Sequence, residues 1–578
     1  MKTHKLSPGL LVALEDFSNE GELGLMRSMH TLGLSPNVGS PQPPKTVVFV
    51  HCTEDADLDY LAPHDVTVNQ RAGRVRTAYL PLASLAPLSD APEVDRIVSS
   101  RYLRPLMDAA PGAVKLPLFR SNSGLGGRGT IVGVIDSGID PLHPAFTNRI
   151  LSIWDQTMPG GGVGEGKYGA ELTGPMLNVS RDFNGHGTHV AGIAAGSEPA
   201  FGGVAPDAQL VIVKTSFQNA HIADGIRYIF RVARERQLPA VVNLSLGGHF
   251  DAHDGTDSLS QIIDSESGAG RIVCCAAGNE GTDNIHAQVL MKAKGKRTLN
   301  FSVPPNLVAD CLLNGWYPGT ASFEISVTSP AGHSTEFRPV VTNANPVKTF
   351  NLPDGRVRVT TPGPDPTNGD HHFLVQIDAT TLGGAVAGGV WKLVVRNPSA
   401  VAGQLDVWTL DDQEAPTVLF SNASATASSR IGSPGSAAGA VTVASFTTKN
   451  QWSDMSGAQR ATGLTLNDIS DFSSEGPLRN GARKPDVAAP GAMIVSALSS
   501  KATNNPANII DATHVIKAGT SMATPFVSGL VALLLERDPT LDPSRLKALL
   551  QANSRIPSKP AGAFDPKWGF GLISALNL

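Results

Sequence analysis

Cysteine is scarce in this chain. Four cysteines among 578 residues cannot form the dense framework of a small disulfide-stabilised domain. Cys274 and Cys275 are adjacent in the apolar run RIVCCAAG, and neighbouring strand residues point to opposite faces. We interpret them as buried thiols. No Cys/His spacing resembles a zinc site, so the sequence offers no metal centre of that kind.

The chain has neither a large excess of charge of one sign nor a long apolar run. The formal net charge is only -5, which argues against nucleic acid or an anionic membrane as the main partner. No uninterrupted apolar stretch is long enough to cross a bilayer. With 41% hydrophobic residues, the chain can fold around large cores and should contain more than one domain.

A signal peptide is not recognisable at the start. The apolar stretch at 10–14 is short, Glu15 and Asp16 follow it at once, and no small-residue cleavage site comes after them. The default expectation is therefore a cytoplasmic protein, with export by another route left open.

Residues 1–44 end in SPNVGSPQPPK, a linker by composition, so we treat them as an extension and linker. Residues 45–107 have the order of a ferredoxin-like α+β unit, β-α-β-β-α-β. Its expected elements are a strand at 46–51, a helix near Ala56–Leu61, a weak strand at 66–68, a strand at 74–81, a helical piece at 82–88 and a strand at 94–101.

From Thr130 onward, buried strands alternate with helices. Near-continuous apolar runs such as TIVGVID and AQLVIVK are typical of strands inside a parallel sheet. The segment 222–236 has helical spacing, and so has 522–537. The pattern predicts an α/β domain with a doubly wound, mostly parallel sheet, in two parts at 108–287 and 426–578.

The stretch 288–425 interrupts this alternation. Short strands such as FEISV and VWKLVVRN are separated by Gly, Pro and Asn turns, and apolar residues alternate with polar ones along several of them. We expect an inserted all-β sandwich or jelly roll here, called the β insert below.

Three short motifs carry reactive side chains. Asp136 ends the apolar strand in VIDSGID, His186 opens a small-residue helix in NGHGTHVAGI, and Ser521 starts the long apolar helix in GTSMATP. Each residue alone has a structural interpretation as a cap or turn residue. A serine hydroxyl, however, needs a base to become nucleophilic, and the base needs a carboxylate to fix its tautomer. Together the three predict a catalytic triad for acyl transfer.

Such a site also needs a donor for the oxyanion. The helix that begins at Ser521 supplies unpaired backbone N–H groups at its start. Asn279, in AAGNEG, can add a side-chain N–H, although it could also be a turn asparagine. His189, on the small-residue helix, is interpreted as a packed or solvent-facing histidine rather than a metal ligand.

These segments resemble the signatures of the subtilisin-like serine peptidases, in the family's order Asp, His, Asn, Ser. The resemblance covers roughly 130–290 and 430–578. It implies a serine endopeptidase acting on polypeptides. It also implies that Ser245, Leu246 and Gly247 pair with the substrate backbone. Ala276, Ala277 and Gly278 would line the pocket for the substrate side chain just before the scissile bond.

The resemblance also concerns the N-terminal unit and metals. Residues 45–107 resemble the family's propeptide, an intramolecular chaperone and inhibitor whose tail occupies the active site. Aligned with propeptide ends, the cut falls near Leu106–Met107. The segment 194–208, where many members carry a calcium loop, is short here. We therefore assign no cofactor and leave structural calcium open.

Two other hypotheses remain at this level. The chain could be a binding or regulatory protein of the same fold, permanently blocked by its N-terminal unit. It could also be a protease that meets other chains through its β insert. The sequence specifies neither the substrate nor the role of the insert.

Overall fold

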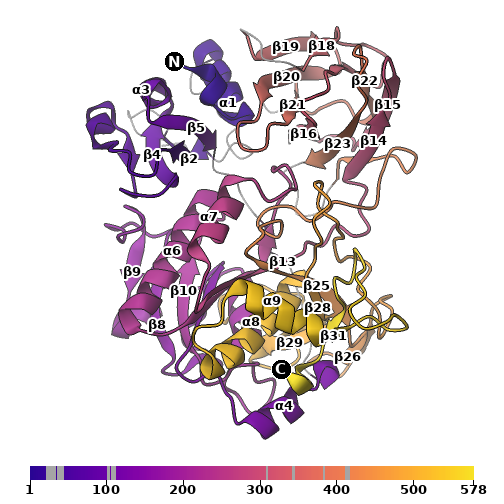
Figure 1. Cartoon of the computed structure of the whole chain (residues 1–578). Coiled ribbons are helices and arrows are strands. Elements are labelled where there is room, and N and C mark those ends of the chain that lie inside the picture. Colours follow the sequence, from indigo (N-terminus) through magenta and orange to yellow (C-terminus); the bar gives the residue numbers. More distant parts are fainter. Residues whose placement is uncertain are drawn as a thin grey trace. The chain divides into compact units, whose positions relative to one another are not determined.

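The chain is described by a computed structural model that covers residues 1–20, 34–35, 45–99, 104–105, 112–307, 310–340, 345–381, 384–410 and 417–578. Two compact units are interleaved along the sequence and are described separately (Figure 1). The first contains Met1–Tyr102 and Asp283–Ala427, and the second contains Leu103–Thr282 and Ser428–Leu578. Within the described ranges, no helix has the length and apolar character that a membrane crossing requires.

The second unit is built on a ten-stranded sheet with β7 (Ile131–Asp136) near its middle. Strands pair in parallel from β32 through to β8, and the edge strands β9 and β31 are antiparallel. The mostly parallel α/β sheet is therefore confirmed. In sheet order the strands are β31 (Ser554–Arg555), β32 (Leu572–Ile573), β28 (Val487–Ala492), β25 (Val441–Thr447), β13 (Arg271–Ala276), β11 (Ala240–Leu244), β7, β10 (Gln209–Lys214), β8 (Ile150–Asp155) and β9 (Ala170–Leu172).

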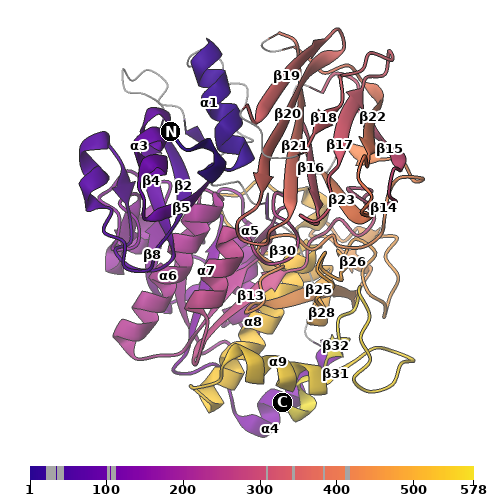
Figure 2. The ribbon, with the colours of Figure 1, turned by 45° about the horizontal axis from the view of Figure 1, so that its top comes forward.

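Helices cover both faces of this sheet. On one face, α6 (Asn219–Arg236) packs so closely that a Cβ at Gly133 would lie 2.5 Å from Ile229. On the other face, Val132 and Val134 share an apolar cluster with α8 (Thr520–Arg537). Alternate strand residues point to opposite faces, so α6 and α8 lie on opposite sides. Helix α7 (Ser258–Glu266) packs on α6, and α5 (His186–Ala195) packs on α8. The unit also contains α4 (Leu116–Ser123) and α9 (Pro543–Ala552) (Figure 2).

In the first unit, the N-terminal part forms an antiparallel sheet in the order β3-β4-β2-β5. Its elements are β2 (Lys45–Cys52), β3 (Thr67–Val68), β4 (Val75–Pro81), α3 (Leu85–Asp90) and β5 (Val94–Ser99), with the two-residue β1 (Leu34–Ser35) beside β2. The helix expected near Ala56–Leu61 is wrong in place and type, because a six-residue 3-10 helix spans Asp59–His64 instead. Pro63 has no N–H to donate, so a regular α-helix cannot continue through it.

Residues 1–20 contain a helix that the sequence analysis did not assign. Helix α1 (Pro8–Glu20) buries Leu10, Leu11 and Val12 in the apolar cluster of the N-terminal sheet. Ahead of it, Leu6 forms an isolated parallel bridge with Ile97 of β5. The apolar residues at 10–14 therefore belong to a folded domain. The proline-rich segment 36–44 lies outside the described residues.

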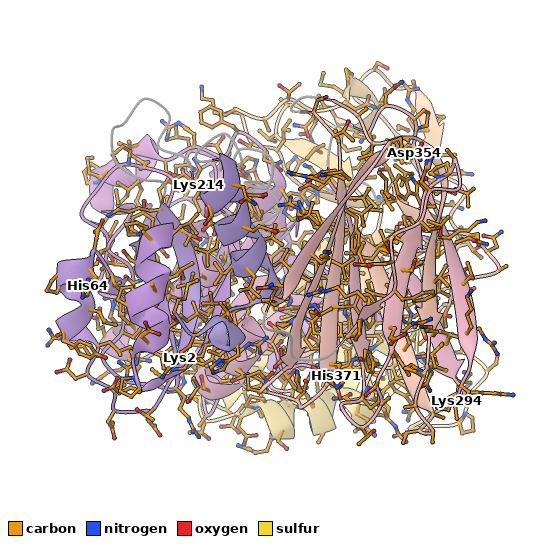
Figure 3. The ribbon with its side chains drawn as sticks, turned by 90° about the horizontal axis from the view of Figure 1, so that it is seen from above. Lys2, His64, Lys214, Lys294, Asp354 and His371 are labelled. Atoms are coloured by element: carbon orange, nitrogen blue, oxygen red, sulfur yellow. The ribbon has the colours of Figure 1, made fainter. Side chains whose placement is uncertain are left out.

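The β insert consists of two antiparallel sheets that enclose one apolar cluster. The first sheet has the order β14 (His286–Met291), β23 (Gly403–Leu410), β16 (Cys311–Tyr317), β21 (His371–Asp378), β20 (Gly355–Pro364) and β19 (Val347–Leu352). The second has the order β18 (Arg338–Pro339), β17 (Glu324–Thr328), β22 (Gly389–Arg396), β15 (Lys296–Val303) and β24 (Leu419–Phe420). Asp354 and His371 mark opposite ends of its long strands in Figure 3.

Candidate active site

Asp136 and His186 meet where β7 ends and α5 begins. The His186 Nδ1 atom lies 2.7 Å from Asp136 Oδ1, and the two side chains are 1% and 0% exposed. Gly185, just before the histidine, has φ +81°, a conformation that side-chain-bearing residues rarely adopt. The carboxylate therefore holds the imidazole with its proton on Nδ1 in the neutral form, which leaves Nε2 as the basic nitrogen.

Ser137 and Asp182 fix the histidine helix against the end of β7. The Ser137 hydroxyl donates to Asp182 Oδ1 at 2.9 Å and accepts from Gly187 N at 2.9 Å. Asp182 Oδ2 accepts from Thr188 N at 2.9 Å and from its hydroxyl at 2.6 Å. Two otherwise unpaired N–H groups of the first helical turn are thus satisfied. Ser137 is not among the site residues predicted from the sequence, although it directly follows Asp136.

Ser521 is the second residue of α8. The preceding Gly519 has φ +155° and ψ 164°, a region that is essentially restricted to glycine. The Ser521 side chain is buried, and its hydroxyl donates to the backbone carbonyl of Ser245 at 3.1 Å. In return, the Ser245 hydroxyl donates to the backbone carbonyl of Ser521 at 2.7 Å. The two serines therefore hold one another in place.

Pro525 explains why the Ser521 carbonyl is available to Ser245. In a regular helix this carbonyl would accept from the N–H four residues later. Residue 525 is a proline inside α8, so it has no N–H to donate. The Ser245 hydroxyl fills that position and ties the start of α8 to the end of β11. The proline in GTSMATP thus has a local structural reason.

Asn279 follows β13 and is anchored by Thr520, the neighbour of Ser521. Its Oδ1 accepts from the Thr520 backbone N at 2.9 Å and from the Thr520 hydroxyl at 3.1 Å. The Thr520 hydroxyl also accepts from Gly278 N at 3.2 Å. Because the amide oxygen is occupied, the orientation of the amide is fixed and Nδ2 is left to donate. That group is suited to stabilise a negative oxygen that forms beside Ser521.

Asn279→Ala is expected to lower kcat for peptide hydrolysis on the order of 10²- to 10³-fold with little change in KM, as the corresponding change does in subtilisin. The reason is that Nδ2 would act on charge that develops only in the transition state. Steady-state kinetics on a peptide amide check this. Asn505→Ala, at an exposed asparagine outside these segments, is the matched control. A loss expressed wholly in KM would contradict the assignment.

The residues expected to bind substrate border the same place. Strand β12 (Leu246–Gly247) directly follows Ser245, and Ala276 and Ala277 are buried at the end of β13. Strand β6 (Arg104–Pro105) pairs antiparallel with β12, with Leu246 opposite Pro105 and Gly247 opposite Arg104. A segment of the chain itself therefore already forms the added strand that the resemblance implies for a substrate.

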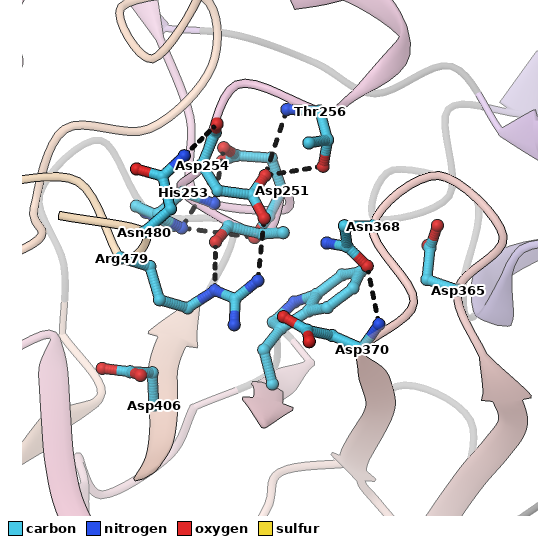
Figure 4. Close-up of polar contacts among 12 residues, drawn as sticks. Asp251, His253, Asp254, Thr256, Asp365, Asn368, Asp370, Asp406, Arg479 and Asn480 are labelled. Carbon is cyan, nitrogen blue, oxygen red and sulfur yellow. Dashed lines mark hydrogen bonds and ion pairs between the residues drawn. The ribbon is translucent and has the colours of Figure 1, made fainter. Parts of the chain in front are cut away.

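The loop after β12 is rigidly tied down, as Figure 4 shows. Arg479 donates through Nε to the Ala252 carbonyl at 2.7 Å and through Nη2 to Asp254 Oδ2 at 2.8 Å. Asp254 Oδ1 also accepts from the backbone N and hydroxyl of Thr256. Asn480 donates through Nδ2 to the backbone carbonyl of Asp254 at 3.0 Å. Several backbone groups of the loop that follows β12 are thus held by hydrogen bonds.

The pKa values of Glu280 and His189, two neighbours of the predicted site residues, are shifted by their surroundings. Burial alone would raise the pKa of Glu280, but hydrogen bonds from His249 and Ser474 outweigh it and lower this pKa to about 2. Glu280 therefore stays charged, and its hydrogen bonds with Ser474 hold the position directly after Asn279. Burial lowers the pKa of His189 well below its usual value, and its Nε2 lies 3.1 Å from the Val515 carbonyl. His189 is thus a packed, neutral histidine.

Within the described ranges, no three His, Cys, Asp or Glu side chains are grouped in a way that could hold a metal ion. The four cysteines Cys52, Cys274, Cys275 and Cys311 are free and buried, as expected for the adjacent pair.

Comparison with known proteins connects this geometry to a family. Two segments, 127–309 and 392–571, match the sequence profile of the subtilase family. The major intracellular serine protease of Bacillus subtilis is 34% identical over 175 residues, which are 29% of this chain and 48% of that protease. Serine protease AprX of the same organism is 30% identical over 219 residues, 35% of this chain and 45% of AprX.

A structural relative covers more of the chain. The CspB protease of Clostridium perfringens superposes with a TM-score of 0.67 at 25% sequence identity, over 80% of this chain and 97% of that one. The chain spans about half the length of the first two curated relatives. Since the family profile matches more than half of the chain, this protein belongs to the subtilase family.

Proposed function

We propose that this subtilase is a serine endopeptidase that hydrolyses polypeptides. The observation that carries the proposal is the buried Asp136–His186 pair, 2.7 Å apart, together with Ser521 at the N-terminus of α8. The named proteases to which the chain is similar support the same reaction class.

In the proposed mechanism the Ser521 hydroxyl turns from the Ser245 carbonyl toward His186 Nε2. The imidazole takes the proton while Oγ attacks the scissile carbonyl carbon, and Asp136 stabilises the imidazolium. Asn279 Nδ2 and the N–H groups at the start of α8 stabilise the negative oxygen of the tetrahedral intermediate.

The second half of the reaction returns the enzyme to its starting state. His186 gives its proton to the leaving amine, the C–N bond breaks, and an acyl-enzyme remains on Ser521. A water molecule then attacks the ester carbonyl and gives a proton to His186, which passes it to Ser521 Oγ as the acid product leaves.

Substrate recognition is proposed to use backbone pairing along Ser245–Gly247. Ala276–Gly278 then line the pocket for the substrate side chain just before the scissile bond. Main-chain pairing tolerates many sequences, because it reads backbone groups rather than side chains. The antiparallel pairing of β6 with β12 supports this mode, since it demonstrates the pairing capacity of the strand.

The same pairing supports regulation by the N-terminal domain. Strand β6 lies near the C-terminal end of residues 45–107, which we propose to be a propeptide-like domain. While Arg104–Pro105 pairs with β12, a substrate cannot pair there. The alternative function, a permanently blocked regulatory protein of the same fold, is favoured by this observation too.

Activity decides between these two functions. Incubating the purified chain with an unfolded polypeptide should release new amino termini, and a serine-directed fluorophosphonate should stop the release. A chain that never cleaves and never reacts with the probe would instead support the blocked protein.

Maturation gives a further prediction. Intact-mass analysis of the purified chain should find two fragments instead of one 60.3 kDa species, because the strand that pairs with β12 comes just before the expected cut in the sequence. N-terminal sequencing should place the cut near Leu106–Met107, a position outside the described residues. An uncut chain with full activity would contradict regulation by cleavage.

A further inference from the structure

Helix α1 of the N-terminal part meets the β insert through buried charges. Arg358 of β20 forms an ion pair with Asp16 of α1 and donates to Asp378 Oδ2 at 2.9 Å. Arg356 donates to Asp378 as well, through Nε at 2.9 Å. Asp16, Arg358 and Asp378 are 3%, 1% and 4% exposed, so this network is shielded from water. We call it the α1 clasp.

A second polar contact lies at the edge strand β5. Arg96 donates through Nη1 to Asp365 Oδ1 at 2.6 Å and to the Thr367 hydroxyl at 3.2 Å. Asp365 is 5% exposed. Its Oδ1 also accepts from Thr367 N at 2.9 Å, so the carboxylate is held in place for the arginine. We call this the β5 clasp.

Apolar and neutral contacts accompany the two clasps. Val347 of β19 packs against the apolar cluster of the N-terminal part. The Thr349 hydroxyl lies 3.5 Å from Glu15 Oε1, and α1 packs along both β19 and β20. The contact between the N-terminal part and the insert is therefore a packed interface with charges inside it.

The N-terminal part contributes charges of opposite sign to the two clasps. The N-terminal part contributes an anion at Asp16 and a cation at Arg96, and the insert supplies a cation and an anion in return. Separation would leave Asp365 without its arginine partner, and would leave two arginines sharing Asp378. Uncompensated buried charges are strongly unfavourable, and the alternating signs also disfavour any other docking orientation.

We propose that the β insert is the docking site that retains the N-terminal domain, so that cutting the chain after this domain does not release it. Cleavage of the chain and release of the N-terminal domain are then separate events, and the strength of the contact with the insert controls the release. This inference deepens the proposed regulation and rests on it, but the retention itself requires no catalysis.

The test uses the full chain with Ser521→Ala, so that no self-cleavage occurs, and with the recognition sequence of a site-specific protease in place of residues 108–111. After cutting, gel filtration measures whether the N-terminal fragment stays with the remainder. Asp16→Asn with Asp365→Asn opens both clasps. Asp65→Asn with Glu324→Gln is the matched control, because it changes the net charge equally but opens the Lys45–Asp65 and Arg396–Glu324 pairs, each within one part.

The parent and control fragments should co-elute with the remainder. The clasp variant should bind its fragment on the order of 100-fold more weakly or worse. Hydrogen exchange in the uncut chains adds a measurement that needs no cleavage, and the amides of α1 should exchange faster only in the clasp variant. Release of the parent fragment on cutting, or equal retention and exchange in all three chains, would overturn the proposal.

A parallel set with Ser521 intact separates this inference from the proposed regulation. Fluorophosphonate labelling after the cut should be slow in the control and fast in the clasp variant. If the fragment dissociates but labelling does not accelerate, the docking proposal stands and inhibition by the N-terminal domain fails. If labelling is absent throughout, the proposed catalysis fails while the retention result still holds.

Discussion

Ser521→Ala is expected to lower kcat for a peptide amide on the order of 10⁶-fold, as the equivalent change does in subtilisin. The substitution removes the only protein atom that is proposed to bond to the scissile carbon. Residual hydrolysis should remain above the rate in water, because Asn279 and the start of α8 still stabilise an oxyanion when water attacks directly. Single-turnover assays with a sensitive peptide amide measure the loss.

Ser528→Ala is the matched control for this change. Ser528 lies on the same helix and is buried, and its hydroxyl can donate its one proton to Asn243 Oδ1 at 2.9 Å or to the Thr524 carbonyl at 3.0 Å. Its loss should reduce the free energy of unfolding by about 1–3 kcal/mol and leave kcat nearly unchanged. Comparable losses of activity in both variants would point to damage of the helix rather than of the nucleophile.

Asp136→Asn should lower kcat about 10⁴-fold while the fold is preserved. Asp136 Oδ1 accepts from His186 Nδ1 and also from Ser137 N at 2.7 Å, so a shape-conserving amide can remain in place. The amide is neutral and cannot stabilise the imidazolium. If its N–H faces Nδ1, it also moves the imidazole proton to Nε2, where the base must be free.

Asp207→Asn controls for the loss of one carboxylate. Asp207 forms an ion pair with Arg128 at 2.9 Å, and its side chain is 43% exposed. Such pairs contribute little to stability, so both kcat and the unfolding midpoint should stay close to those of the parent. If Asp136→Asn loses its activity only because it unfolds, circular dichroism at the assay temperature will reveal it.

Much of the fold of the second unit could be predicted from the sequence. Buried parallel strands are written as continuous apolar runs, as in 131–136, and the reactive residues follow such runs or open helices. The local motifs therefore predict Asp136, His186 and Ser521 as a triad, and in the structure Asp136 and His186 lie 2.7 Å apart. Asn279 was also expected, but its anchoring by Thr520 depends on two segments that are 241 positions apart.

The N-terminal part shows where sequence reasoning stops. The apolar residues at 10–14 are too few to define a helix by periodicity, and their partners are strands far along the chain. Nothing near Asp16 indicates that it will meet Arg358, which lies 342 positions away. Likewise the 3-10 helix at Asp59–His64 reflects the effect of one proline more than helical propensity. Such long-range pairings are decided by tertiary packing.

The most direct test of the central claim is to map the fluorophosphonate adduct on the intact wild-type chain by tandem mass spectrometry. Ser521 should carry the label. In Ser521→Ala the labelling should disappear and kcat for peptide hydrolysis should fall on the order of 10⁶-fold. An adduct on any other residue that accounts for the inhibition, or peptide hydrolysis at close to the wild-type rate in Ser521→Ala, would contradict the assignment of Ser521 as the nucleophile.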